Sequence, residues 1–265
     1  MTIAFDLSIA GYFMALLLAS ADLFFRRQFL AKLATAILAA GFVAQTAYIS
    51  LRWHAAARAP LTNLFESLVL FAWAVVVVYL VVRTRVRIPV LAVSAALIAL
   101  LALAYASTFE SDIQPLMPAL RSNWLTVHVL TCFLGYGAFA VAAASSVSYL
   151  VSTARKNTPR HGQHEKLEEV SAKTIAFGFL FLTMGIMSGA VWANSAWGTY
   201  WQWDPKETWS LVTWFVYAVY LHCRFMRGWK GRRAAAISVA GFAAVLFTYF
   251  GVNFLLSGLH SYAAS

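Results

Sequence analysis

The chain has 265 residues, of which 62% are hydrophobic and only 11% are charged, and its formal net charge is +10 at pH 7. Soluble domains are roughly half apolar and a quarter charged, so this composition excludes a water-soluble globular protein. The basic residues are spread over many short connections and form no patch on a soluble domain, which excludes nucleic-acid binding.

Eight long apolar runs follow one another along the chain. A helix needs about 20 apolar residues to cross the hydrocarbon layer, and these runs lack the in/out alternation of a membrane β-strand. We therefore predict an all-α integral membrane protein, a bundle of about eight transmembrane helices that forms a single polytopic membrane domain over residues 1–265. The predicted spans are 7–25, 30–50, 65–82, 88–106, 127–152, 174–193, 208–224 and 235–256.

The basic residues alternate between the two sides of this ladder. Sixteen lie in every second connection: Arg26, Arg27, Lys32, Arg83, Arg85, Arg87, Arg155, Lys156, Arg160, Lys166, Lys173, Arg224, Arg227, Lys230, Arg232 and Arg233. The other four, on the opposite side, are Arg52, Arg58, Arg121 and Lys206. Because cytoplasmic loops carry the excess of Lys and Arg, both termini are predicted on the non-cytoplasmic side.

The first apolar run ends in Ala19-Ser20-Ala21, which resembles a signal-peptidase site. A signal peptide begins with a basic segment, whereas the first charge here is Asp6. We therefore expect the first helix to be retained.

The first outer loop carries His54, which we interpret as a surface histidine, and then Asn63 and Glu66 at N-cap and N3 spacing ahead of the third apolar run. Capping of a helix N-terminus is enough to explain both. The alternative is that Glu66 is a functional carboxylate, since an acid close to hydrocarbon is costly.

Cys132 and Cys223 lie near opposite ends of their predicted helices, so about 30 Å of bilayer separates them and no disulfide is expected. The inner connection 153–173 contains His161 and His164 among several glutamates. We interpret this connection as solvated and not as a metal site.

Tryptophan is concentrated in the outer connection 194–207 and the helix that follows it. Within 23 consecutive positions the chain has six of its ten tryptophans, where an even distribution would give about one: Trp192, Trp197, Trp201, Trp203, Trp209 and Trp214. An aromatic belt at the membrane interface explains some of them but not three within seven residues of a loop. The residues Asp204 to Glu207 also have a structural explanation, as N-cap, N1 proline and N3 glutamate of the next helix.

Flat aromatic faces beside a helix N-terminus suit a large planar ligand with carboxylates, such as haem. Haem iron also needs axial ligands, and imidazole is a common one. His128 and His260 both lie on the outer side with the tryptophan loop, so we predict a bis-histidine site. His222 lies about 20 Å along its helix from Trp209, near the inner surface, where it is either a helix-end residue or a ligand for haem entering from the cytoplasmic half.

These residues resemble the tryptophan-rich haem-handling (WWD) superfamily of cytochrome c biogenesis, whose signature is W-G-x-x-W-x-W-D. The matching positions are Trp197, Gly198, Trp201, Trp203 and Asp204. Further segments over about residues 60–262 resemble the CcsA (ResC) branch, the membrane subunit of the System II cytochrome c synthase: Asn63 to Ser67, Asp204 to Trp209, Tyr220-Leu221-His222 and Leu256 to Tyr262.

The resemblance implies that His128 and His260 ligate haem iron at the outer face, and that Trp197, Gly198, Trp201, Trp203 and Asp204 bind and orient haem b as the substrate. It implies that His222 is the embedded histidine of an inner haem site whose second histidine comes from a CcsB (ResB) partner subunit. The reaction implied is thioether formation between haem vinyl groups and the C-x-x-C-H cysteines of apocytochrome c, with the two histidines and the tryptophan loop as the catalytic groups.

The further partners implied are thiol-reducing thioredoxin-like proteins and membrane lipid. The location implied is the bacterial inner membrane, or the thylakoid membrane if the chain is plastid-encoded. The alternative function is a non-enzymatic membrane haem transporter or haem-binding regulator. A generic small-molecule transporter is disfavoured, because no broken-helix repeats occur.

Overall fold

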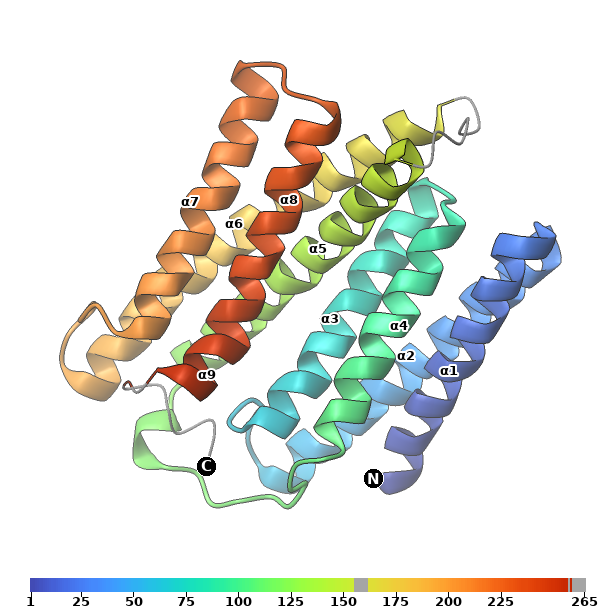
Figure 1. Cartoon of the computed structure of the whole chain (residues 1–265). Coiled ribbons are helices and arrows are strands. Elements are labelled where there is room, and N and C mark those ends of the chain that lie inside the picture. Colours follow the sequence, from blue (N-terminus) through green and yellow to red (C-terminus); the bar gives the residue numbers. More distant parts are fainter. Residues whose placement is uncertain (155–161, 257, 259–265) are drawn as a thin grey trace. The chain divides into compact units, whose positions relative to one another are not determined.

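The computed structural model describes residues 1–154, 162–256 and 258, and within these residues it is helical with no strand (Figure 1). This confirms the predicted all-α fold class. The chain divides into two compact units, Met1–Gln114 (unit 1) and Pro115–Ser265 (unit 2). The single membrane domain stays a prediction, and each unit is described by itself below.

Unit 1 contains four long helices. They are α1 (Thr2–Phe25), α2 (Gln28–Ala56), α3 (Leu64–Arg85) and α4 (Pro89–Ala106). Helix α1 packs against α2 and α4, and α3 packs against α4. Pro89 occupies the first turn of α4, where its missing N–H has no partner to lose.

Unit 2 contains four more long helices. Its elements are the 3₁₀ turn η1 (Pro118–Leu120), α5 (Asn123–Ala154), α6 (Gln163–Trp197), α7 (Pro205–Met226), α8 (Gly231–Leu246), the π-helical turn η2 (Phe247–Gly251) and α9 (Val252–Leu255). Helices α5 and α6 pack together, α8 packs against α5 and α7, and α7 packs against α6. We call the end of unit 2 that carries residues 198–204 its outer end, after the predicted orientation, and the opposite end its inner end.

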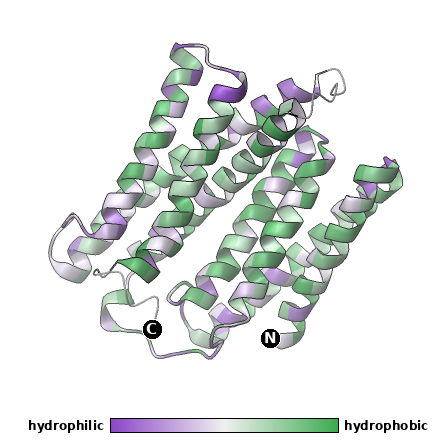
Figure 2. Cartoon of the chain, viewed as in Figure 1, coloured by the Kyte–Doolittle hydropathy of each residue, from purple (hydrophilic) through white to green (hydrophobic). Residues whose placement is uncertain are grey.

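Seven helices of the described chain are long and apolar enough to cross a membrane, namely α1 to α6 and the continuous stretch Gly231–Leu255. The eighth, α7, has 22 residues but falls outside this set by composition, because it is rich in Trp and Tyr and has a His and two basic residues. Figure 2 shows that apolar residues run along the helices while polar residues gather toward their ends. All eight predicted runs are therefore helical, and the protein is a multi-pass membrane protein.

The prediction that residues 153–173 form a connection is wrong for residues 163–173, because α6 already begins at Gln163. This first part of α6 is polar and extends beyond the apolar run, and it is supported by charge pairs such as Lys173 with Glu169 at 2.6 Å. The outer connection is likewise shorter than predicted, at residues 198–204. Hydropathy marks where a helix is apolar, whereas backbone hydrogen bonding continues into its polar ends.

A buried ion-pair cluster holds the outer loop of unit 1. Asn63 caps α3 by accepting the Glu66 N–H at 2.8 Å, as predicted. The Glu66 carboxylate is fully buried and pairs with Arg52 at 2.9 Å and Arg58 at 3.1 Å. It accepts the backbone N–H of Thr62, one residue before the N-cap, at 2.9 Å. These contacts give Glu66 a structural role.

Candidate functional site

His128 lies in the second turn of α5 at the outer end of unit 2, half-buried against α6. Its Nδ1 is 2.7 Å from the carbonyl oxygen of Gly185 and 3.7 Å from Cys132 Sγ. Its ring is nearly parallel to that of Trp192, with an interplanar angle of 13° and centroids 6.2 Å apart. The predicted ligand is thus held in a defined position by backbone and side-chain contacts.

Trp192 connects His128 to the tryptophan loop. It is almost fully buried in a cluster with Leu120 and Leu125, and its Nε1–H donates to the carbonyl of Ala119 at 3.0 Å. Its ring meets that of Trp197 edge-on at 4.8 Å. In the sequence Trp192 is one member of the tryptophan cluster with no separate role, and only its tertiary contacts show that it supports His128.

The loop 198–204 begins where α6 ends. Gly198 adopts a left-handed conformation with φ of 80°, and its N–H caps the helix on the Asn194 carbonyl. This is the C-terminal position at which glycine is preferred, so the signature glycine has a structural reason.

Two signature tryptophans form the middle of the loop, with rings perpendicular and centroids 5.7 Å apart. Trp203 has a positive φ of 58°, which is rare for a bulky residue, and 69% of its surface is exposed. Trp201 has its Nε1 atom buried without a hydrogen-bond partner among the described residues. A strained backbone that presents an exposed aromatic ring, and a buried indole N–H, are features typical of a ligand site.

The start of α7 is a complete capping box. The Asp204 carboxylate accepts the Lys206 N–H at 2.9 Å, and the Glu207 carboxylate accepts the Asp204 N–H at 3.2 Å and the Gln202 N–H at 2.8 Å. This confirms the structural explanation given for residues 204–207. A role of Asp204 in haem binding stays a prediction.

Two contacts bring the C-terminal segment to the start of α7. The Lys206 ammonium donates to Asn253 Oδ1 at 2.7 Å, and its charge also acts on Cys132, one turn from His128. Gly258 lies so close to Asp204 that a Cβ built on it would be 2.5 Å from Oδ1. His260, two residues later, lies outside the described residues, so its predicted role as a ligand stays a prediction.

Lys206 is the first-turn cation of α7 and precedes the apolar span predicted for residues 208–224. Burial lowers its pKa from 10.5 to about 8, and the neighbouring Asp204 carboxylate opposes this shift. The sequence marks Lys206 as an outer-side charge within the segment Asp204 to Trp209, and the structure adds that it joins α7 to α9.

The π-helical turn η2 lies just before α9 and contacts the first half of α7. Thr248, within this turn, donates to the Trp209 carbonyl at 3.2 Å and lies 3.1 Å from the Thr213 hydroxyl. A π turn inserts an extra residue into a helix and changes the direction of the residues that follow. Here the residues that follow are α9 and its Asn253.

His222 lies four residues before the end of α7, near the inner end of unit 2 as predicted, and its side chain is exposed. His222 shares one face of α7 with other exposed residues, which recur three or four positions apart: Val212, Phe215, Val219 and Met226. The imidazole therefore points away from the helices of unit 2 on an apolar stripe.

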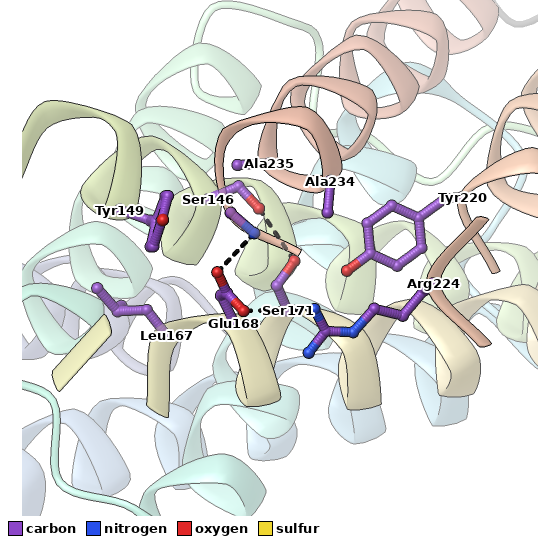
Figure 3. Close-up of a pocket in the computed structure, with 10 residues that line it drawn as sticks. Ser146, Tyr149, Leu167, Glu168, Ser171, Tyr220, Arg224, Ala234 and Ala235 are labelled. Atoms are coloured by element: carbon purple, nitrogen blue, oxygen red, sulfur yellow. Dashed lines mark hydrogen bonds and ion pairs between the residues drawn. The ribbon is translucent and has the colours of Figure 1, made fainter. Parts of the chain in front are cut away.

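A small polar pocket lies at the inner end of unit 2, between α5, α6, α7 and α8 (Figure 3). Glu168 accepts the Gly231 N–H at 2.6 Å and pairs with Arg224 at 3.3 Å, while the hydroxyls of Ser146 and Ser171 are 2.9 Å apart. These contacts tie the inner ends of four helices together, and so fix the end of α7 that bears His222.

Apart from Cys132, which lies beside His128, the other residues named from the sequence lie away from the site. His164 Nε2 is 2.9 Å from Ser152 Oγ, and His161 lies outside the described residues. His54 is exposed near the end of α2. Cys132 and Cys223 are both free thiols.

The fold and the candidate site thus define a class, a polytopic membrane protein with an aromatic cluster at one end of a unit that has four long helices in its described residues. Residues 61–260 match the family model described as "Cytochrome C assembly protein". The chain is 40% identical over 267 aligned positions to the protein named "Cytochrome c biogenesis protein CcsA" of Synechococcus sp. (strain CC9311), covering 87% of this chain and 88% of that one.

A protein of the same name from Chlamydomonas reinhardtii is 43% identical over 221 positions, covering 80% of this chain and 63% of that one. The chain therefore belongs to the cytochrome c assembly protein family and is of the CcsA type, which gives it a role in cytochrome c maturation. A solved structure titled "Cytochrome c Heme Lyase CcmF" has the same fold, with a TM-score of 0.76 at 20% identity over 94% of this chain and 46% of CcmF, so this chain spans about half the length of that protein.

Proposed function

We propose that this chain is the haem-handling subunit of a System II cytochrome c synthase, which presents reduced haem b at the outer end of unit 2 for attachment to the C-x-x-C-H segment of apocytochrome c. The observation that carries the proposal is the placement of His128 beside Trp192, whose ring in turn meets that of the signature residue Trp197. A nitrogen ligand next to a cluster of aromatic rings is an arrangement suited to an iron porphyrin.

Further observations support haem as the substrate. The indole N–H of Trp201, buried and without a partner among the described residues, is a donor suited to a ligand acceptor such as a propionate. The N-terminus of α7 offers positive partial charge to the same groups. His260 is the proposed second axial ligand, because Gly258, two residues before it in the sequence, lies against Asp204.

The reaction itself needs little from the protein beyond placement. Each thioether forms when a cysteine S–H adds across a vinyl C=C bond, the sulfur joining one carbon and the hydrogen the other, so no oxidant is consumed. The thiols must be reduced, which is the proposed task of thioredoxin-like partners. Haem must be held in one orientation, and this is the contribution proposed for the two histidines and the tryptophan loop.

We further propose a CcsB (ResB) type partner at the exposed stripe of α7. His222 points outward from the described helices of unit 2, so we propose that a second ligand to iron at that position comes from another molecule. His222→Ala should lower the amount of haem reaching the outer site without changing its spectrum. Normal haem occupancy of this variant under haem limitation would contradict the proposal.

The proposed location is the bacterial inner membrane, or the thylakoid membrane if the chain is plastid-encoded, in line with its cyanobacterial and algal relatives.

The experiment that tests the proposal uses the chain purified with its partner. We expect the absorption spectrum of six-coordinate low-spin haem, its loss in His128→Gly and in His260→Gly, and partial recovery of spectrum and maturation with added imidazole. Normal maturation and spectrum in both variants would show that the histidines are not ligands.

The second candidate function is a haem transporter or regulator that is not an enzyme. The two functions are distinguished by whether haem becomes covalently attached to the apocytochrome segment. With an apocytochrome segment containing C-x-x-C-H, a synthase yields haem that stays attached after acid–acetone extraction. A segment with both cysteines replaced by serine is the control. Haem that is delivered but remains fully extractable from both segments would favour the transporter.

A further inference from the structure

The neighbourhood of His128 contains a feature that the proposed function does not use, the glycines on the facing side of α6. A Cβ built on Gly189 would lie 2.6 Å from His128 Nδ1, and one built on Gly185 would lie 2.5 Å from Cys132 Sγ. Real Cβ atoms do not approach other heavy atoms so closely. Glycine at these positions therefore lets the imidazole and the thiol lie directly on the α6 backbone.

The contact with α6 also decides the protonation pattern of the ring. The Gly185 carbonyl oxygen, 2.7 Å from His128 Nδ1, can only accept a hydrogen bond, so Nδ1 carries the proton. In the neutral ring the lone pair is then on Nε2, the nitrogen on the far side from α6. A backbone carbonyl that binds one ring nitrogen of a ligating histidine fixes its tautomer and raises its basicity.

A third contact limits rotation of the ring. The indole of Trp192 lies nearly parallel to the imidazole and is itself fixed by its hydrogen bond to Ala119 and by burial. The imidazole thus lies between the α6 backbone and a buried, hydrogen-bonded aromatic ring.

We infer that the backbone of α6 at Gly185 and Gly189 is the positioning element that gives His128 its Nδ1–H tautomer and directs Nε2 to the metal. This inference rests on the proposed function, since it assigns a purpose to that orientation. Gly189 acts through His128 and is a positioning residue.

The test is Gly189→Ala, in which the added methyl group must displace the imidazole. The matched control is Gly178→Ala, three turns earlier on α6, where a Cβ would lie 2.7 Å from Phe139 Cε1. Both changes gain the same helix propensity and create the same kind of overlap, but only one touches a histidine. In Gly189→Ala we expect a loss of haem affinity of roughly 10- to 100-fold, the range typical of changes around metal ligands, with loss of the low-spin spectrum. Gly178→Ala should keep the wild-type spectrum.

A double-mutant cycle separates positioning from general packing. If Gly189 acts only by seating the imidazole, Gly189→Ala should lower maturation little further in the His128→Gly background. A wild-type spectrum in Gly189→Ala, an equal loss in Gly178→Ala, or additive effects with His128→Gly would each overturn the inference, while the His128→Gly result by itself decides the proposed function.

A measurement without any glycine variant keeps the inference falsifiable if Gly189→Ala does not fold. Histidine labelled with ¹⁵N in the haem-free chain, with His128→Gln for assignment, should show a neutral ring protonated at Nδ1. A ring protonated at Nε2 would overturn the inference and leave the proposed function untouched.

Discussion

At the scale of single residues, the tryptophan loop combines local strain with exposure. The left-handed backbone of Trp203 is a conformation that glycine would adopt more readily, yet the sequence places a large aromatic ring there. A residue that keeps an unfavourable conformation and does not bury its side chain has no evident role in stability. The side chain of Trp203 is therefore best explained by contact with a ligand.

This explanation makes a prediction with two variants of Trp203. Trp203→Gly should be more stable than Trp203→Ala by about 1 kcal/mol, since a left-handed non-glycine residue costs about that much. Both should lose haem retention to a similar degree, because both lack the ring. Thermal unfolding and haem content of the purified chain check the two parts. Wild-type haem retention in either variant would contradict a role of the ring in binding.

Lys206 gives a prediction for pH dependence. Its folded-state pKa of about 8 is below its ordinary value of 10.5, because burial penalises the charged form. The unfolded state therefore binds more protons between about pH 8 and pH 10.5, and stability rises with pH across this window. Below about pH 8 the amine is charged in both states and the cost of burying it is fully present.

The rise in melting temperature from pH 7 to pH 10 should therefore be larger for the wild type than for Lys206→Met. Lys173→Met is the control, because Lys173 is 75% exposed and should leave the wild-type profile unchanged. Parallel profiles for the wild type and Lys206→Met would show that the Lys206 amine does not lose its proton in this range.

At the scale of elements, ion pairs at the ends of the helices differ greatly in what they contribute. Glu66 is buried between two arginines whose other donors bind the carbonyls of Ser111 and Gln114, so it joins the α2–α3 loop to the segment after α4. Glu169 and Lys173 form an exposed pair on a single helix. Burial, not the presence of a pair, decides their effect on stability.

Glu66→Gln should therefore destabilise the chain by about 3 to 5 kcal/mol, because it leaves buried arginine charges uncompensated. The matched change Glu169→Gln should alter stability by less than about 0.5 kcal/mol. Denaturation in detergent compares the two variants. Equal stabilities of Glu66→Gln and Glu169→Gln would show that water reaches the Glu66 cluster. Glu66 would then again be a candidate functional carboxylate.

At the scale of the whole molecule, the alternation of charge predicts the orientation of the chain. Reporter fusions after residues 160 and 230 should be cytoplasmic, and fusions at residue 200 and at the C-terminus should be external, because sixteen of the twenty basic residues lie in the predicted cytoplasmic connections. An external reporter at 160 or 230 would place the tryptophan loop in the cytoplasm and contradict the proposed attachment of haem outside.

The sequence by itself determined the features that depend on composition and on neighbouring residues. Apolar length located all eight helices, and local capping patterns at Asn63 and at Asp204 to Glu207 located two helix starts, because each depends on residues a few positions apart. Where a polar stretch stayed helical, as at the start of α6, hydropathy gave the wrong boundary.

Only the tertiary structure decided what surrounds the candidate ligand. Gly185 and Gly189 are 57 and 61 positions after His128, and their role depends on how α5 and α6 pack, which no local pattern encodes. The same holds for Lys206 and Asn253, which are 47 residues apart and meet through the packing of α7 with α9. Side chains that converge from distant segments are specified by packing and can be identified only once the helices are placed.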